Sequence, residues 1–161
     1  MAVSVEISIS DSIESGEDDV PEPGLLQQWA AAAYLGEASA IVSIRVSSSA
    51  EIQQLNKDYR HKDKLTNVLS FPMQLPEDLE IDLSDDILGD IALCASVIND
   101  EAVQQSKSKE AHWAHMVVHG MLHLQGYDHI SEADAAEMEQ LEIDILEQLD
   151  FPDPYRVTET A

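Results

Sequence analysis

The chain has 161 residues, 44% of them hydrophobic, and its 8 basic residues stand against 32 acidic ones, which gives a formal net charge of −24. This acidic balance argues against a broad nucleic-acid-binding surface, and no run of about eighteen apolar residues is present to span a membrane. The N-terminus lacks the features of a signal peptide, and the single cysteine excludes an intrachain disulfide. We therefore expect one cytoplasmic domain over residues 1–161.

The predicted elements begin with a strand at residues 3–9, where apolar and polar residues alternate with the period of two that marks a half-buried strand. An acidic loop rich in Ser, Gly and Pro follows at 10–23. The alanine-rich segment 24–35 predicts a helix that Gly36 closes. Residues 40–47 alternate again and predict a second strand.

The rest of the chain predicts further strands and several helices. Ser49 can cap a helix over 49–60, which has Ile52, Leu55 and Tyr59 on one side. The later elements are a loop at 61–66, a strand at 67–73, an acidic loop at 75–86, a strand at 87–95 in which Gly89-Asp90 marks a bulge or close approach, and helices at 96–105, 108–125 and 131–149. This order predicts an α+β fold: a small mixed sheet of about four strands packed by helices.

The predicted helix at 108–125 is apolar on nearly every side, which indicates that it is buried at the centre of the fold. Its polar residues beyond the first turn are mainly histidines. At ~100° per residue, His112, His115, His119 and His123 fall within an arc of roughly 80°. Buried polar groups need partners, and a metal ion would satisfy two of these imidazoles.

The spacing of the last histidines predicts where that metal binds. His119 and His123 are four residues apart and share one helix face. Gly126 can end the helix with a positive φ, so that His129 returns as a third ligand. Three protein ligands and one open position are typical of catalytic zinc, so we expect metal-assisted hydrolysis. Imidazole also suits nickel, copper and iron.

His115 has the same four-residue spacing from His119, so spacing alone does not select the ligands. His115 lies further from the Gly126 turn. We therefore interpret His112 and His115 as residues that support the ligands or line the cleft.

Half of the basic residues lie in one short window: Lys57, Arg60, Lys62 and Lys64. A local positive patch can persist on an acidic protein, because salt screens charges beyond ~8 Å. The planar guanidinium of Arg60 suits phosphate oxygens and could stabilise charge on a phosphoryl group, which favours phosphodiester hydrolysis. On charge alone, a solvated loop is an equally good interpretation.

The histidine spacing also occurs in metzincin peptidases, in which a glutamate follows the first histidine and acts as general base. Gly120 occupies that position here and cannot take a proton. Asp128 is one substitute, although a turn or capping role suits it as well. A metzincin-like peptidase therefore stays as an alternative.

Several segments together carry a family resemblance, and they are Asn56–Arg60, Asp63–Pro72, Leu88–Ile91 with Cys94, His112–Gly120 running into the histidine motif with Gly126-Tyr127-Asp128-His129, Glu137–Glu139 and Asp153–Tyr155. With these segments the chain resembles the YbeY family of metal-dependent endoribonucleases, which act in ribosomal RNA maturation. The resemblance covers residues 50–156, and the N-terminal third adds little to it.

The resemblance implies an α+β fold with a central sheet and helices around a metal cleft. It implies one zinc ion held by His119, His123 and His129, with His119 counted among the catalytic residues. It also implies that Arg60 is catalytic or contacts RNA, with further contacts from Lys57, Lys62 and Lys64.

The implied substrate is single-stranded RNA, notably the 3′ end of small-subunit ribosomal RNA. The implied partners are the ribosome or its associated proteins, in ribosome quality control. A non-catalytic ribosome-assembly factor with a structural metal is the remaining alternative.

Overall fold

The computed structural model describes residues 3–10, 20–36, 39–62, 66–72, 86–127 and 131–155. The expected single domain over 1–161 and most of the acidic loops expected at 10–23 and 75–86 extend beyond these residues. In chain order the elements are β1 (Val3–Ile9), α1 (Pro23–Ala33), β2 (Ala40–Ser47), α2 (Ser49–Arg60), β3 (Val68–Pro72), β4 (Asp86–Cys94), α3 (Ala95–Gln104), α4 (Lys109–Leu124) and α5 (Glu132–Gln148).

The strands of the described residues form one mixed sheet in the order β1-β2-β4-β3. β1 pairs parallel to β2, and β2 pairs parallel to β4, whereas β3 pairs antiparallel to β4 at the edge. The predicted α+β fold with a small mixed sheet is therefore confirmed. The bulge expected at Gly89 is also present, because the register between β2 and β4 shifts there and Gly89 has a φ of 136°.

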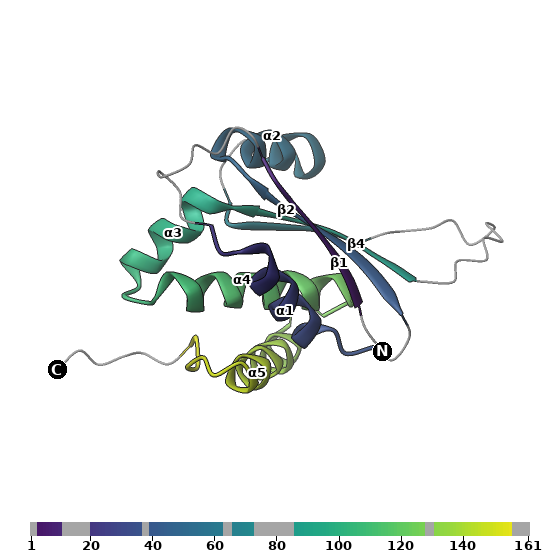
Figure 1. Cartoon of the computed structure of the whole chain (residues 1–161), viewed down its shortest axis with the longest axis vertical. Helices are drawn as coiled ribbons and strands as arrows, with labels where there is room; N and C mark the ends of the chain where they lie inside the picture. The colour runs from purple at the N-terminus through teal and green to yellow at the C-terminus, as the bar shows by residue number, and fades with distance from the viewer. Residues whose placement is uncertain are drawn as a thin grey trace.

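The helices cover the two faces of the sheet unequally (Figure 1). α2 lies on one face, over a small cluster that includes Ile52, Leu69 and Cys94. α1 and α4 pack on the other face, and α5 packs on the outer side of α4. α4 is therefore enclosed between the sheet and a second helical layer, which explains its apolar character on nearly every side. None of the helices in the described segments is long and apolar enough to cross a membrane.

The two ends of α4 are fixed by local interactions that its sequence predicts. Ser108 caps the N-terminus, where its hydroxyl accepts a hydrogen bond from the backbone N–H of Ala111 at 3.0 Å. At the C-terminus Gly126 has a φ of 98°, as expected, and the N–H of Tyr127 returns to the carbonyl of Leu122 at 3.0 Å. Gly126 therefore turns the chain sharply after the histidines.

Several helix ends differ from the expectation by one or two residues, and two of these differences have a clear local cause. α1 ends at Ala33 rather than at residue 35, because Tyr34 adopts an extended conformation before Gly36 is reached. α2 is capped by Ser48 rather than Ser49, since the Ser48 hydroxyl and the Glu51 carboxylate form a reciprocal capping box. The run of three serines at 47–49 hid which hydroxyl makes the cap.

Gly120 lies on the face of α4 that packs against the sheet. A Cβ atom at this position would lie 3.2 Å from two side-chain carbons of Ile91 and 3.4 Å from the hydroxyl oxygen of Ser70. The Ser70 hydroxyl also donates a hydrogen bond to the carbonyl of Gly120 at 3.3 Å. A methyl group at this position therefore requires a small shift of the Ile91 side chain, and a larger side chain would enter the core.

We predict that Gly120→Glu lowers the free energy of unfolding by about 3 kcal/mol or more, because it overpacks the sheet contact and buries a carboxylate. Gly120→Ala is the matched control: its clash with Ile91 opposes a gain in helix propensity of about 1 kcal/mol, so it should stay close to the wild type. Urea unfolding followed by circular dichroism measures both. A glutamate variant as stable as the alanine variant would contradict this packing.

Candidate metal centre

His119 and His123 lie one above the other in the last two turns of α4, and their imidazoles converge. The Nε2 atoms of the two rings are 3.0 Å apart, and the ring centroids are 4.5 Å apart. The His119 side chain is 20% exposed, so the pair lies at the edge of the core rather than inside it. The four-residue spacing has therefore brought two ring nitrogens to one point that solvent can reach.

Glu142, on the buried face of α5, holds the other side of this histidine cluster. Its residue is 1% exposed. One carboxylate oxygen, Oε1, lies 3.0 Å from Nδ1 of His119. The other, Oε2, accepts a hydrogen bond from the Tyr155 hydroxyl at 2.7 Å and also contacts Nε2 of His115. One carboxylate thus connects α4, α5 and the segment that follows α5.

The surroundings of Glu142 keep it ionised. Burial alone would raise the pKa of this carboxyl, but the hydrogen bonds with His115 and His119 outweigh burial and lower the pKa to about 2. Burial and the adjacent Glu142 carboxylate raise the pKa of Tyr155, so its hydroxyl stays protonated and donates. An ionised Glu142 accepts the Nδ1–H of His119, and this tautomer leaves the lone pair of Nε2 facing His123.

This donor set fits a metal ion. Two ligands of a tetrahedral metal with bonds of about 2.0–2.1 Å lie about 3.3 Å apart, close to the 3.0 Å between the two Nε2 atoms. A direct hydrogen bond between the rings also gives such a separation. The carboxylate behind His119 repeats the carboxylate–histidine–metal arrangement of known sites. The described residues hold no group of three His, Cys, Asp or Glu side chains placed to bind a metal, and His129, the third expected ligand, lies outside them.

The two earlier histidines of α4 also contact carboxylates. Nε2 of His115 contacts Glu142, as described above. Nε2 of His112 lies 3.0 Å from Glu101, a carboxylate that also accepts hydrogen bonds from the side-chain amide of Asn67. Burial lowers the pKa of His112. In this arrangement both histidines turn Nε2 toward a carboxylate rather than toward the His119–His123 pair.

The basic window expected to contact RNA is described in part. Lys57 lies near the end of α2 and Lys62 just beyond it, and both are exposed. Arg60 is the last residue of α2, but its side chain lies outside the described structure. Lys64 and Asp128 also fall outside the described residues. The roles expected for these residues and for the histidines therefore stay predictions.

Sequence reasoning missed Glu142 as a member of the site. A signal was present, because Glu142 follows Met138 by four residues and precedes Ile145 by three, which places it in the apolar stripe of α5. A lone carboxylate within an apolar stripe needs a buried partner, and the histidine row of α4 was the obvious one. In a chain with 32 acidic residues this carboxylate did not stand out.

The mixed sheet and its buried central helix define an α+β protein, and a histidine pair anchored by a buried carboxylate lies at the edge of its core. Residues 24–150 match the family model described as Endoribonuclease YbeY. The chain belongs to this family, and the resemblance seen in the sequence is confirmed.

Curated relatives cover most of the chain. A protein named Endoribonuclease YbeY from Alteromonas mediterranea is 51% identical over 88% of this chain and 88% of its own length. Proteins of the same name from Pseudomonas putida and Nitrosococcus oceani are 49% and 47% identical over 87% and 84% of this chain, and each is covered over 88% of its length.

A solved structure shares the fold at low sequence identity. The solution structure of TM1509 from Thermotoga maritima matches with a TM-score of 0.54 at 22% identity, over 94% of this chain and 99% of that one. At this identity the match supports the fold alone.

We predict that Glu142→Gln lowers the affinity for zinc by about 10- to 100-fold, because the neutral amide no longer fixes the tautomer of His119. Competition with a chromophoric chelator measures the affinity, and circular dichroism checks the fold. Glu139→Gln is the matched control, since Glu139 is an exposed carboxylate on the same helix. Equal zinc affinities for the two variants would show that Glu142 does not support the ligands.

Proposed function

We propose that this chain is a zinc-dependent endoribonuclease that cleaves single-stranded RNA, and that its substrate is the 3′ end of small-subunit ribosomal RNA. Endoribonuclease activity follows from membership of the Endoribonuclease YbeY family. We further propose that the enzyme works in the cytoplasm, on or near the ribosome and its associated proteins, in rRNA maturation and ribosome quality control.

One observation carries the metal dependence: Nε2 of His119 faces Nε2 of His123 at 3.0 Å while Nδ1 of His119 is held by Glu142. A hydrolase needs its metal ligands fixed before substrate arrives, and a buried carboxylate with three donors around it provides such rigidity. His129 follows the Gly126 turn and is proposed as the third ligand, which leaves one coordination position for substrate or water.

In this proposal the residues of the chain have separate roles. Zinc, when bound, would supply Lewis-acid polarisation and a more acidic water. His119 and His123 hold that centre at the edge of the core, and Glu142 and Tyr155 keep His119 in one tautomer. Arg60 is proposed to contact a non-bridging phosphate oxygen and to stabilise the charge that grows on the phosphoryl group. Lys57, Lys62 and Lys64 would hold the neighbouring phosphates.

The peptidase alternative loses support from the packing of α4. The residue after the first ligand histidine, where metzincins carry their glutamate, is Gly120. Its missing side chain would point at Ile91 and Ser70 in the sheet rather than at the histidine pair. The chain therefore carries no catalytic glutamate at this position, and the packing around Gly120 leaves no space for one.

We predict that the purified protein cleaves a ribosomal RNA fragment spanning the mature 3′ end, that chelation abolishes cleavage and that added zinc restores it. His123→Ala should be inactive, which also controls for a contaminating nuclease. Cleavage that is equal in wild type and variant would reject the assignment. Circular dichroism shows whether chelation also unfolds the protein. Unfolding would instead favour the assembly factor with a structural metal.

We predict that Arg60→Ala lowers kcat for this RNA by about 100-fold or more while zinc stays bound, since the loss of one oxyanion donor has that effect in other hydrolases. Arg60→Lys keeps the charge but not the planar guanidinium, and its activity should lie between those of the wild type and Arg60→Ala. Zinc content is measured on the same samples. Undiminished cleavage by Arg60→Ala would remove Arg60 from the mechanism.

A further inference from the structure

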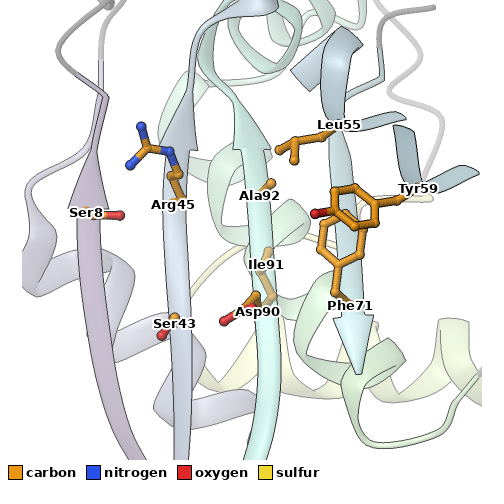
Figure 2. A pocket seen from close by; sticks show the side chains of 9 residues that line it. All are labelled: Ser8, Ser43, Arg45, Leu55, Tyr59, Phe71, Asp90, Ile91 and Ala92. Carbon is orange, nitrogen blue, oxygen red and sulfur yellow. The ribbon is translucent and has the colours of Figure 1, made fainter. Parts of the chain in front are cut away.

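A pocket of about 530 Å³ is lined by side chains of the sheet and of α2 (Figure 2). It lies on the sheet face that carries α2, and the histidine helix α4 packs on the opposite face (Figure 1). Its volume falls in the range of about 300–1,000 Å³ that small-ligand sites occupy. α2 supplies one wall through Leu55 and Tyr59. The mechanism proposed above does not use this pocket.

The floor of the pocket consists of two rows of side chains that cross the sheet. Ser43, Asp90 and Phe71 are register partners on β2, β4 and β3 and form one row. Ser8, Arg45 and Ala92 form the next row on β1, β2 and β4. The floor therefore changes from an aromatic ring at one end to hydroxyl, carboxylate and guanidinium groups at the other (Figure 2).

Tyr59 offers a stacking surface at the aromatic end. Its ring meets the ring of Phe71 edge to face, with centroids 5.5 Å apart and an interplanar angle of 65°. Phe71 thereby supports the tyrosine from below. Tyr59 is nevertheless 67% exposed. The sequence pattern predicts Tyr59 on the apolar side of its helix, but in the structure the residue is mostly accessible to a planar partner.

Asp90 offers a hydrogen-bond acceptor further along the floor, where its carboxylate points toward Ser43 on β2 (Figure 2). It is exposed, and within the described segments its carboxylate has no hydrogen-bond or ion-pair partner. It lies directly across from Phe71 on the adjacent strand. Arg45, by contrast, is paired with Glu51 at 2.9 Å, so Arg45 does not neutralise Asp90. A ligand that stacks on Tyr59 and extends along the floor toward β2 would reach the Asp90 carboxylate.

We propose that this pocket binds a guanine base of single-stranded RNA, an inference that rests on the proposed function. Guanine has a flat face for Tyr59 and, alone among the four bases, two adjacent N–H donors, N1–H and N2–H, on its Watson–Crick edge. A carboxylate accepts two such bonds side by side. Aromatic side chains also stack unpaired bases in known RNA-binding modules, although Tyr59 comes from a helix above the sheet.

The position of the pocket connects it to the RNA path proposed above. Tyr59 directly precedes Arg60 at the end of α2. β3, which carries Phe71, is the edge strand of the sheet, and its Ser70 also contacts Gly120 of the histidine helix. A strand of RNA that passes this edge could place one base on Tyr59 while its backbone continues past Arg60. The pocket would then select where the enzyme cleaves relative to a guanine.

The test measures binding without cleavage, in full-length His123→Ala protein. Fluorescence anisotropy compares three uridine-rich octamers whose central base is guanine, hypoxanthine or uracil. Hypoxanthine lacks the N2 amino group, so we expect about tenfold weaker binding, the loss of one hydrogen bond to a charged group. Asp90→Asn should abolish this preference. Tyr59→Ala should lower the affinity for the guanine octamer about tenfold. Tyr59→Phe, the matched control, should bind this octamer as tightly as the parent protein does.

Equal affinities for the three octamers would overturn the inference, as would unchanged guanine binding by Tyr59→Ala with the fold intact by circular dichroism. A third outcome would also overturn it: a lysine-rich peptide binds in an Asp90-dependent manner, while Asp90→Asn and Tyr59→Ala leave the RNA affinities unchanged. That result would indicate a basic protein partner. Because cleavage is measured separately on wild-type protein, a failed base preference leaves the endoribonuclease proposal standing, and failed cleavage leaves the binding result interpretable.

Discussion

The buried carboxylate of Glu142 is the interaction on which the arrangement of the histidines depends. An ionised side chain that is 1% exposed is stable only because His115, His119 and Tyr155 surround it with hydrogen-bonding groups. These groups come from different elements, so the carboxylate can be satisfied only when α4, α5 and the segment after α5 have docked. The fold and the orientation of His119 are therefore determined together.

The same constraint explains how much of the site the sequence predicts. Local patterns predict the strands, the burial of α4 and the turn at Gly126, because each depends on side-chain periodicity or on one residue's φ. The i,i+4 spacing predicts that His119 and His123 share a face. Glu142 lies 19 residues beyond His123 in the sequence, and only the packing of α5 on α4 brings the carboxylate to the histidines.

Smaller differences between sequence and structure have equally local causes. Three consecutive serines could each cap α2, and only the geometry of Glu51 selects Ser48. Tyr59 has the spacing of a core residue but is mostly exposed: it borders the pocket over the sheet, and its ring contacts Phe71 edge to face. Periodicity identifies the side of a helix and does not say how far the neighbouring layer extends.

The charge of the chain determines how it can recognise a polyanion. With a net charge of −24 the protein gains little from counterion release over a broad surface, which is the usual source of affinity for nucleic acid. Under the proposed function, contacts with RNA are few and strong: the cationic window at the end of α2, base stacking, and coordination at the histidine pair. Such contacts depend on bases being unpaired and on a phosphate reaching one position. An acidic nuclease of this design would reject duplex RNA by repulsion and accept a single strand that can be drawn across one edge of its sheet.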